Sequence, residues 1–155
     1  MYLRFPDYLN PNALSFRIFD INLSLTWYSL SYIFGIICAW YLIYSLTKKQ
    51  SLWHEKSPLN TKDVEDLMTY LILGIIIGGR MGYVLFYNPS FYISSPISIF
   101  YLWEGGMSFH GGFIGVVLGA LYYCIRNKIS ILPMGDIIAV STPPGLFLGR
   151  LANFV

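Results

Sequence analysis

The residues best suited to chemistry lie between Trp103 and Gly119, in the stretch WEGGMSFHGGFIGVVLG. This stretch holds His110, one of only two histidines in the chain, together with Glu104 and six of the fourteen glycines. Because an imidazole can accept a proton near neutral pH, His110 is a candidate general base. The residues alone do not name the group that it would deprotonate. The alternative is that His110 is an interfacial side chain hydrogen-bonded to a loop.

Two arginines lie inside apolar segments, Arg80 in GGRMGYVLFYN and Arg150 in GRLANF. An arginine within a membrane costs about 2.5 to 3.5 kcal/mol even on a lenient insertion scale, so something must compensate its charge. A guanidinium can hold a phosphate with two parallel hydrogen bonds, and both residues are therefore candidate ligands of a phospholipid phosphate. For Arg80, extension to the lipid headgroups or pairing with Glu104 is an alternative of equal weight. Asn153 lies near one helix face with Arg150.

Two further polar residues have a chemical and a structural interpretation. Tyr28, in LTWYSLSY, is either a site residue or a member of the aromatic belt at the headgroup level. Asp136 most simply caps the helix that follows Pro133 or interacts with its dipole. Cys38 and Cys124 are not in a metal-type spacing, and no metal ligand set is visible, so neither a metal nor a cofactor is expected.

The composition indicates an integral membrane protein. Of the 155 residues, 55% are hydrophobic and only 12% are charged, whereas soluble domains have roughly 25% charged residues. The net charge of +2 gives no reason to expect a nucleic-acid partner. Four segments reach the roughly 20 residues that a spanning helix needs, namely 23–46, 64–87, 107–125 and 134–155. The sequence therefore predicts one all-α membrane domain over residues 1–155.

Glycines and prolines predict how these spans pack. One helix face carries three glycines at four-residue spacing: Gly111, Gly115 and Gly119. A neighbouring helix can approach that face closely, and we expect His110 to enter the same interface. The Pro-Pro-Gly run at 143–145 should kink or break the fourth span. We expect residues 1–23 to form an interfacial lead-in, and residues 88–106 to form an interfacial, partly helical connection.

Basic residues near the span ends predict the orientation. Residues 47–63 and 126–133 together carry six lysines and arginines, whereas the N-terminal segment carries two and residues 88–106 carry none. The N-terminus and the 88–106 connection are therefore expected outside the cytoplasm. At about 1.5 Å per helical residue, four candidate residues would then converge on the outer leaflet: Tyr28, Arg80, His110 and Arg150.

These motifs resemble those of the bacterial prolipoprotein diacylglyceryl transferases. WEGGMSFHGG, GGRMGYVLFYN and GRLANF look like successive motifs of that family, and FPDYLNP and LTWYSLSY also fit. The family moves a diacylglyceryl group from phosphatidylglycerol to the thiol of a lipobox cysteine and releases glycerol phosphate. The resemblance thus implies a transferase of the bacterial plasma membrane. Its implied partners are phosphatidylglycerol, membrane lipid and a prolipoprotein signal peptide that carries the lipobox cysteine.

The resemblance also implies roles for single residues. Arg150 and Asn153 match signature positions for phosphatidylglycerol binding and catalysis, Tyr28 matches an essential tyrosine, and His110 matches a histidine that acts as base or orienter. We therefore expect His110, Tyr28 and Asn153 to be catalytic. Arg150 and Arg80 are expected to bind phosphatidylglycerol.

Some positions depart from the family pattern. Ala152 stands where a glycine is common, Thr26 where some members have histidine, and Glu104 where aspartate is frequent. The family also continues past position 155 with further site residues, so we expect residues 1–155 alone to be inactive, with no helix covering Gly145 and Gly149. Two other functions stay open: a non-enzymatic lipid-binding or assembly protein, and an anion-conducting membrane protein lined by the two arginines.

Overall fold

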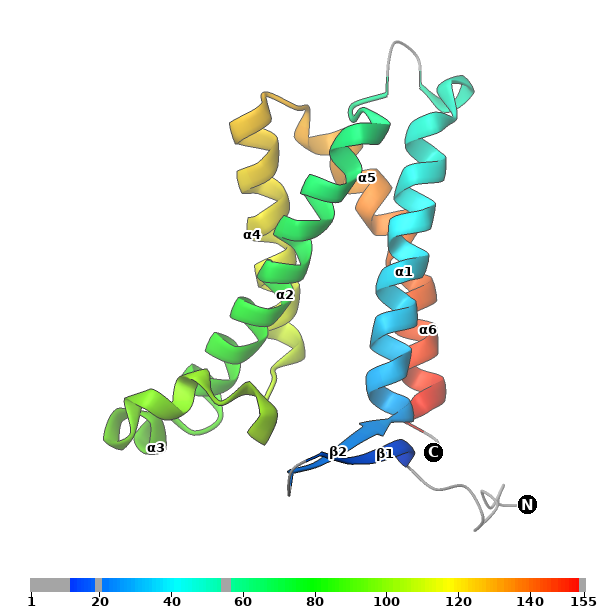
Figure 1. Cartoon of the computed structure of the whole chain (residues 1–155). Coiled ribbons are helices and arrows are strands. Elements are labelled where there is room, and N and C mark those ends of the chain that lie inside the picture. The colour runs from blue at the N-terminus through cyan, green and yellow to red at the C-terminus, as the bar shows by residue number, and fades with distance from the viewer. Residues whose placement is uncertain (1–11, 19–20, 54–56, 154–155) are drawn as a thin grey trace, which may run out of the picture. The chain divides into compact units, whose positions relative to one another are not determined.

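Figure 1 shows the computed structural model of the chain, which describes residues 12–18, 21–53 and 57–153. In this part of the chain, four helical segments are long and apolar enough to cross a membrane: Trp27–Lys48, Thr61–Phe86, Phe109–Asn127 and Ile131–Ala152. The predicted all-α membrane architecture is confirmed, and the protein is a multi-pass membrane protein. The helices belong to two compact units, one formed by residues up to 52 with those from 136 onward, and the other by residues 53–135.

The first unit begins with a hairpin that the sequence analysis did not predict. Strands β1 (Asn12–Ile18) and β2 (Ile21–Thr26) pair antiparallel, with a register irregularity near Asn12 and Leu14. Helix α1 (Trp27–Lys48) therefore starts later than the expected residue 23. Thr26 fixes this start, because its hydroxyl accepts a hydrogen bond from the Ser29 backbone N–H at 3.1 Å. The remaining lead-in, with the FPDYLNP motif, lies outside the described residues.

The fourth predicted span is broken, as expected, into α5 (Ile131–Ser141) and α6 (Pro143–Ala152). Pro143 and Pro144 open α6, where a helix has no intrahelical use for the missing N–H. Pro133 fits inside the first turn of α5 for the same reason. Asp136 consequently lies within α5 with an exposed side chain, and the expectation that it caps this helix is wrong.

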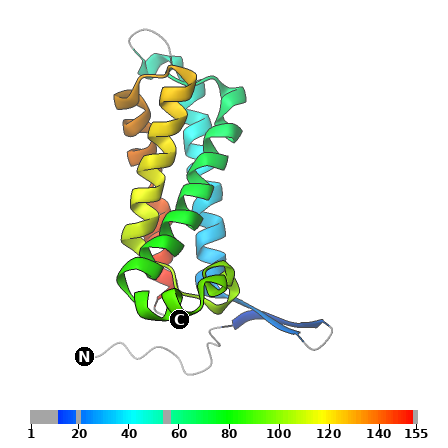
Figure 2. The same cartoon turned by 90° about the vertical axis from the view of Figure 1, so that its left-hand side faces the viewer.

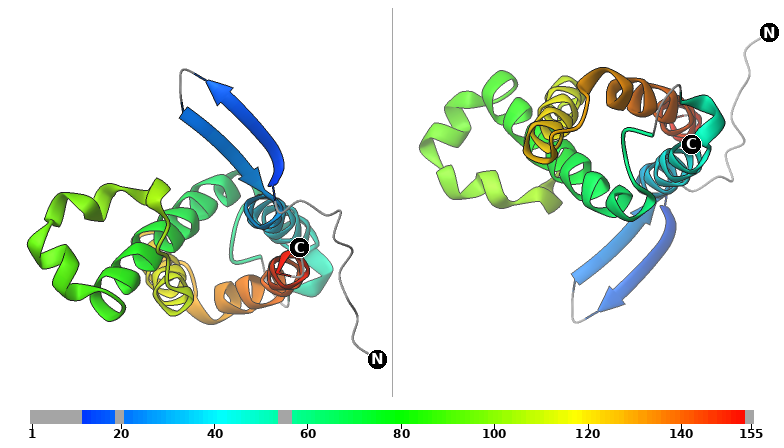
Figure 3. Two further views of the ribbon diagram at one scale, coloured as in Figure 1. Left: turned by 90° about the horizontal axis from the view of Figure 1, so that it is seen from below. Right: turned by 90° about the horizontal axis from the view of Figure 1, so that it is seen from above.

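Glycine allows α1 and α6 to pack closely in the first unit. A Cβ added to Gly35 would lie 2.9 Å from the Gly145 Cα, which is closer than real Cβ atoms approach backbone. The end-on views show α6 directly beside α1 (Figure 3). Gly145, expected to lack a covering helix, therefore has one. Among the described residues no helix covers Gly149, because a Cβ there would meet none of their atoms within 4 Å.

In the second unit, α2 (Val64–Phe86) and α4 (Phe109–Asn127) lie side by side (Figure 2). The predicted close-packing face of α4 is confirmed, and it meets a matching glycine row on α2: Gly74, Gly78 and Gly82. A Cβ on Gly82 would lie 2.7 Å from the Gly111 Cα, and one on Gly119 would lie 2.7 Å from the Tyr70 carbonyl oxygen. Backbone touches backbone along this seam, so its spacing tolerates no added side chain.

The connection between these two helices is partly helical, as predicted. It contains α3 (Pro89–Ser94) and two short 3-10 helices, η3 (Pro96–Phe100) and η4 (Leu102–Glu104). Gly105 and Gly106 follow with φ values of +82° and +83°, which favour glycine because it lacks a Cβ. The chain then enters α4 through Ser108, whose hydroxyl accepts a hydrogen bond from the Gly111 N–H at 3.3 Å.

Candidate functional site

Arg80, on α2, is buried, with 3% of its surface exposed. Its guanidinium donates hydrogen bonds to five backbone carbonyl oxygens of the connection that leads to α4. The Nε bond to Ile99 is 2.9 Å, the Nη2 bonds to Ser98 and Tyr101 are 2.7 and 3.1 Å, and Nη1 bonds to Gly105 and, at 3.2 Å, to Gly106. An arginine side chain has five N–H donors, so all of them are used.

This arrangement differs from the two structural alternatives for Arg80, and phosphate binding by Arg80 stays a prediction. The side chain does not extend to the surface, and its donors meet carbonyl oxygens and not the Glu104 carboxylate. A phosphate could bind Arg80 only if some of these carbonyl bonds were given up. A buried side chain of this kind also cannot line an anion pathway. The alternative of an anion-conducting protein lined by Arg80 and Arg150 therefore loses one of its two arginines.

The rest of the GGRMGY motif packs against the turn that precedes His110. The Gly79 carbonyl accepts a hydrogen bond from the Ser108 N–H at 2.9 Å. A Cβ on Gly79 would lie 2.7 Å from the end of the Met107 side chain, so only glycine fits there without movement. Tyr83 lies against Gly106, since a Cβ on Gly106 would meet its ring. The two motifs, distant in sequence, thus form one structural feature.

His110 is the second residue of α4 and lies in its first turn, as predicted. Its side chain is exposed, with the ring edge-on to Phe109 at a centroid distance of 5.7 Å. The expectation that His110 enters the glycine interface is wrong. That interface is made by Gly111 and the glycines one and two turns further along, whereas a position one residue earlier points about 100° away around the helix. The exposed imidazole is free to meet a ligand.

The first unit holds the other predicted site residues, and a hydroxyl pair marks the start of α1. The Tyr28 and Tyr32 hydroxyl oxygens are 2.8 Å apart, with ring centroids at 4.9 Å in an edge-to-face arrangement. Both side chains are about half exposed, at 45% and 51%. Tyr32 was not singled out from the sequence, although its four-residue spacing from Tyr28 places both on one helix face.

Arg150 lies in the last turn of α6, and its side chain is exposed. Helix α6 packs against α1 where Gly145 meets Gly35, and Arg150 lies toward the end of this helix pair at which α1 starts and the Tyr28–Tyr32 pair stands (Figure 1). Asn153 follows at the end of α6, where its backbone N–H donates to the carbonyls of Gly149 and Arg150, each at 3.2 Å. Its side chain is also exposed. An accessible guanidinium, two hydroxyls and an amide can together bind an anionic oxygen group.

Tyr28, Arg150 and Asn153 thus belong to one compact unit, and Arg80 and His110 to the other. The predicted convergence of these residues on one membrane leaflet stays a prediction. Across the described residues, no three His, Cys, Asp or Glu side chains gather as a metal site would require.

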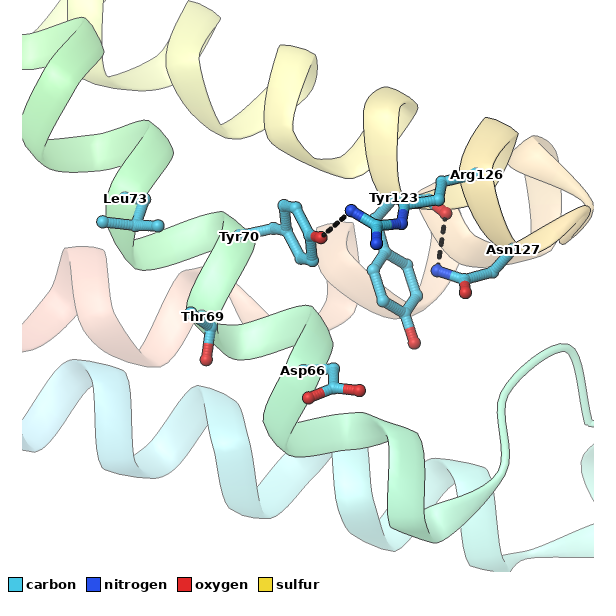
Figure 4. A pocket seen from close by; sticks show the side chains of 7 residues that line it. All are labelled: Asp66, Thr69, Tyr70, Leu73, Tyr123, Arg126 and Asn127. Carbon is cyan, nitrogen blue, oxygen red and sulfur yellow. Dashed lines mark hydrogen bonds between the residues drawn. The ribbon is translucent and has the colours of Figure 1, made fainter.

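A cavity of about 400 Å³ lies between the start of α2 and the end of α4, and thus away from His110, which is in the first turn of α4. Seven residues line it: Asp66, Thr69, Tyr70, Leu73, Tyr123, Arg126 and Asn127. Arg126 donates to the Tyr70 hydroxyl at 3.1 Å, so two of the lining side chains are bonded to each other (Figure 4). None of the predicted site residues lines this cavity. Its lining contains both a carboxylate, that of Asp66, and a guanidinium, that of Arg126. We therefore do not place the candidate site there.

Comparison with known sequences agrees with the motifs. The sequence profile of the family described as "Prolipoprotein diacylglyceryl transferase" matches residues 16–155. Relatives named phosphatidylglycerol–prolipoprotein diacylglyceryl transferase are 46% identical over 154 residues in Cereibacter sphaeroides, 49% over 139 residues in Rickettsia felis and 50% over 132 residues in Bradyrhizobium diazoefficiens. These matches cover 99%, 89% and 85% of this chain.

The same matches cover 76%, 52% and 47% of the three relatives, and 52% of a further Cereibacter sphaeroides sequence. The chain therefore spans about half the length of most of the curated relatives it matches. The profile match includes LTWYSLSY, GGRMGYVLFYN, WEGGMSFHGG and GRLANF, whereas FPDYLNP lies before its first residue. The resemblance noted from the motifs is confirmed, and the chain belongs to the prolipoprotein diacylglyceryl transferase family.

Proposed function

We propose that the protein transfers a diacylglyceryl group from phosphatidylglycerol to the cysteine thiol of a prolipoprotein lipobox. The observation that carries this proposal is the accessible Arg150 guanidinium, at the same end of the α1–α6 helix pair as the Tyr28–Tyr32 hydroxyl pair. These groups suit the phosphate of an anionic lipid. The names of the relatives supply the two substrates, phosphatidylglycerol and prolipoprotein.

The reaction balances as a displacement at carbon. The thiol sulfur forms a bond to the terminal carbon of the diacylglyceryl group, and the bond from that carbon to the phosphate oxygen breaks. The electron pair leaves with glycerol phosphate, whose negative charge Arg150 stabilises. The thiol proton passes to His110, because a thiolate is the reactive nucleophile and a free thiol has a pKa near 8.5.

Tyr28 and Asn153 position the substrate in this proposal. The Tyr28 hydroxyl is oriented by Tyr32, and the Asn153 amide lies one turn beyond Arg150 on α6. Both can donate to or accept from oxygens near the bond that breaks. Arg80 is given no phosphate contact, because its donors are already bonded to carbonyl oxygens.

We further propose that the protein lies in the bacterial inner membrane, with its N-terminus and the 88–106 connection outside the cytoplasm. The support is the six-to-two distribution of basic residues over the two sets of connections. A secreted precursor presents its lipobox cysteine at the outer face. This orientation therefore fits the proposed substrate.

The test is a transfer assay in phosphatidylglycerol nanodiscs with a lipobox peptide. Since the chain spans about half of its relatives, it is assayed alone and joined to the C-terminal half of the Rickettsia felis relative. We expect the joined protein to add a diacylglyceryl mass to the peptide and to release glycerol phosphate. A peptide with serine in place of the cysteine is the control and should gain no mass.

Lipid binding without any peptide adduct would contradict transfer and favour the alternative of a non-enzymatic lipid-binding protein.

A further inference from the structure

We propose that Arg80 is a positioning residue. It holds residues 98–106 in the shape that sets the start of α4, and thereby fixes His110. The inference that Arg80 affects catalysis through His110 rests on the proposed function. The inference that Arg80 fixes the position of His110 does not, and it can be tested without any enzymatic activity.

The guanidinium of Arg80 is the centre around which the connection folds. Its five acceptors are carbonyl oxygens spread over residues 98 to 106, and those of Ser98 and Tyr101 also accept a backbone N–H bond within the connection, at 3.2 and 3.3 Å. The Tyr92 ring adds a further contact, with the guanidinium carbon 5.4 Å from its centroid. The carbonyl dipoles and the ring compensate the buried charge.

Only an arginine can make this set of contacts. A guanidinium is planar and presents five donors in a fixed fork, whereas a lysine ammonium presents three donors from one atom. Lysine could therefore keep the charge but would leave at least two of the five carbonyls without their donor. Hydrogen bonds from a charged donor stabilise more than neutral ones do, so the loss of two of them would loosen the connection.

Three residues separate the last of these carbonyls, that of Gly106, from His110. They are also tied to α2. Ser108 is buried, and its N–H donates to Gly79, the residue next to Arg80. The Ser108 hydroxyl then caps the first turn of α4. A change in the connection is thus transmitted directly to the imidazole.

The first experiment uses the 155-residue chain in nanodiscs and needs no activity. A His54→Gln substitution leaves His110 as the only histidine, so ¹³C-histidine labelling gives a single NMR reporter. We expect Arg80→Lys to shift the His110 signal or split it into several. It should also speed hydrogen exchange in residues 98–110, while α1 and α6 keep their exchange rates.

The matched control is Arg126→Lys, which changes an exposed arginine at the other end of the same helix pair. It should leave the His110 signal unchanged. Tyr92→Leu is a milder second variant, which removes the ring contact and keeps all five hydrogen bonds; it should shift the same signal less. An unchanged His110 signal in a folded Arg80→Lys protein, or an equal shift in Arg126→Lys, would overturn the proposal. So would an Arg80→Lys protein that fails to fold while Tyr92→Leu leaves the His110 signal unmoved.

The second experiment separates positioning from phosphate binding in the joined protein described above. A displaced catalytic group costs about 10²-fold for a misplacement near 1 Å. We therefore expect Arg80→Lys to lower kcat by about 10- to 100-fold while KM for phosphatidylglycerol stays within about twofold. A raised KM with an unchanged kcat would contradict positioning and make Arg80 a direct lipid ligand. If no variant shows transfer, the proposed function fails, and the NMR result still decides the role of Arg80.

Discussion

Among single residues, Tyr28 owes its defined hydroxyl position to Tyr32. Their hydrogen bond of 2.8 Å holds the two hydroxyl groups together at the start of α1. The sequence pointed to Tyr28 through its motif but not to Tyr32. The four-residue spacing of Tyr32 from Tyr28 does not distinguish a tyrosine that faces lipid from one that is hydrogen-bonded to the neighbouring hydroxyl.

Replacing each tyrosine by phenylalanine separates the two roles. We expect Tyr28→Phe to reduce transfer by about 10²-fold, since it removes the group that contacts substrate. Tyr32→Phe should cost about fivefold, because it removes one hydrogen bond worth about 1 kcal/mol. Rates with the lipobox peptide are compared with Tyr41→Phe, which alters an exposed tyrosine on the same helix. A Tyr32→Phe protein more impaired than Tyr28→Phe would reverse the assignment.

Arg80 shows why a residue's role cannot always be derived from its type and depth. Its position inside an apolar segment predicted a charge that needs compensation, and that was right. The compensating groups are backbone carbonyls of a connection whose fold depends on two glycines with positive φ and two 3-10 helices. Backbone acceptors of this kind cannot be predicted from a pattern of side chains. Three partners for Arg80 therefore stayed possible from the sequence: lipid headgroups, Glu104 and a phosphate.

Among the helices and strands, spacing predicted what depends on one helix alone. Four-residue glycine spacing identified the packing face of α4, and the Pro-Pro-Gly run identified the break before α6. The β1–β2 hairpin was missed, because seven- and six-residue strands with mixed polarity resemble an irregular interfacial segment. Placing His110 in the glycine interface was also wrong, since a one-residue offset turns a helical side chain by about 100°.

The glycine seam gives a prediction about stability. We expect Gly115→Ala to lower the free energy of unfolding by about 1 to 3 kcal/mol or more, because its Cβ would lie 3.1 Å from the Gly78 Cα and closer still to the Gly74 carbonyl. Gly135→Ala is the matched control on α5, where a Cβ meets nothing within 4 Å. That change should be neutral or stabilise by up to about 1 kcal/mol. Thermal unfolding in nanodiscs measures both, and equal effects would show that the seam does not depend on glycine.

For the whole molecule, the distribution of basic residues makes a prediction about topology. After replacement of Cys38 and Cys124 by alanine, single cysteines are introduced at Ser94 and Ser51, which are both exposed. In intact cells we expect an impermeant thiol reagent to label Ser94→Cys, and to label Ser51→Cys only after the membrane is opened. Labelling of Ser51→Cys alone in intact cells would mean the opposite orientation.

The whole-molecule account depends on groups from both compact units acting in one reaction. His110 comes from the unit of α2 and α4, and Arg150 from the unit of α1 and α6. Close glycine contacts pack the helices within each unit: Gly35 against Gly145 between α1 and α6, and the glycine seam between α2 and α4. Family membership supports a common function for them, and kinetics must test it.

The most direct measurement is the transfer rate of His110→Gln and Arg150→Lys in the joined protein, with Arg126→Lys as the control. We expect His110→Gln to lower kcat by about 10²- to 10⁴-fold, as loss of a general base does. Arg150→Lys should lower kcat/KM strongly, because lysine cannot form the two parallel bonds to phosphate. Arg126→Lys should transfer at the parent rate. Near-normal transfer by both site variants, with normal membrane insertion, would contradict the proposed site and the mechanism built on it.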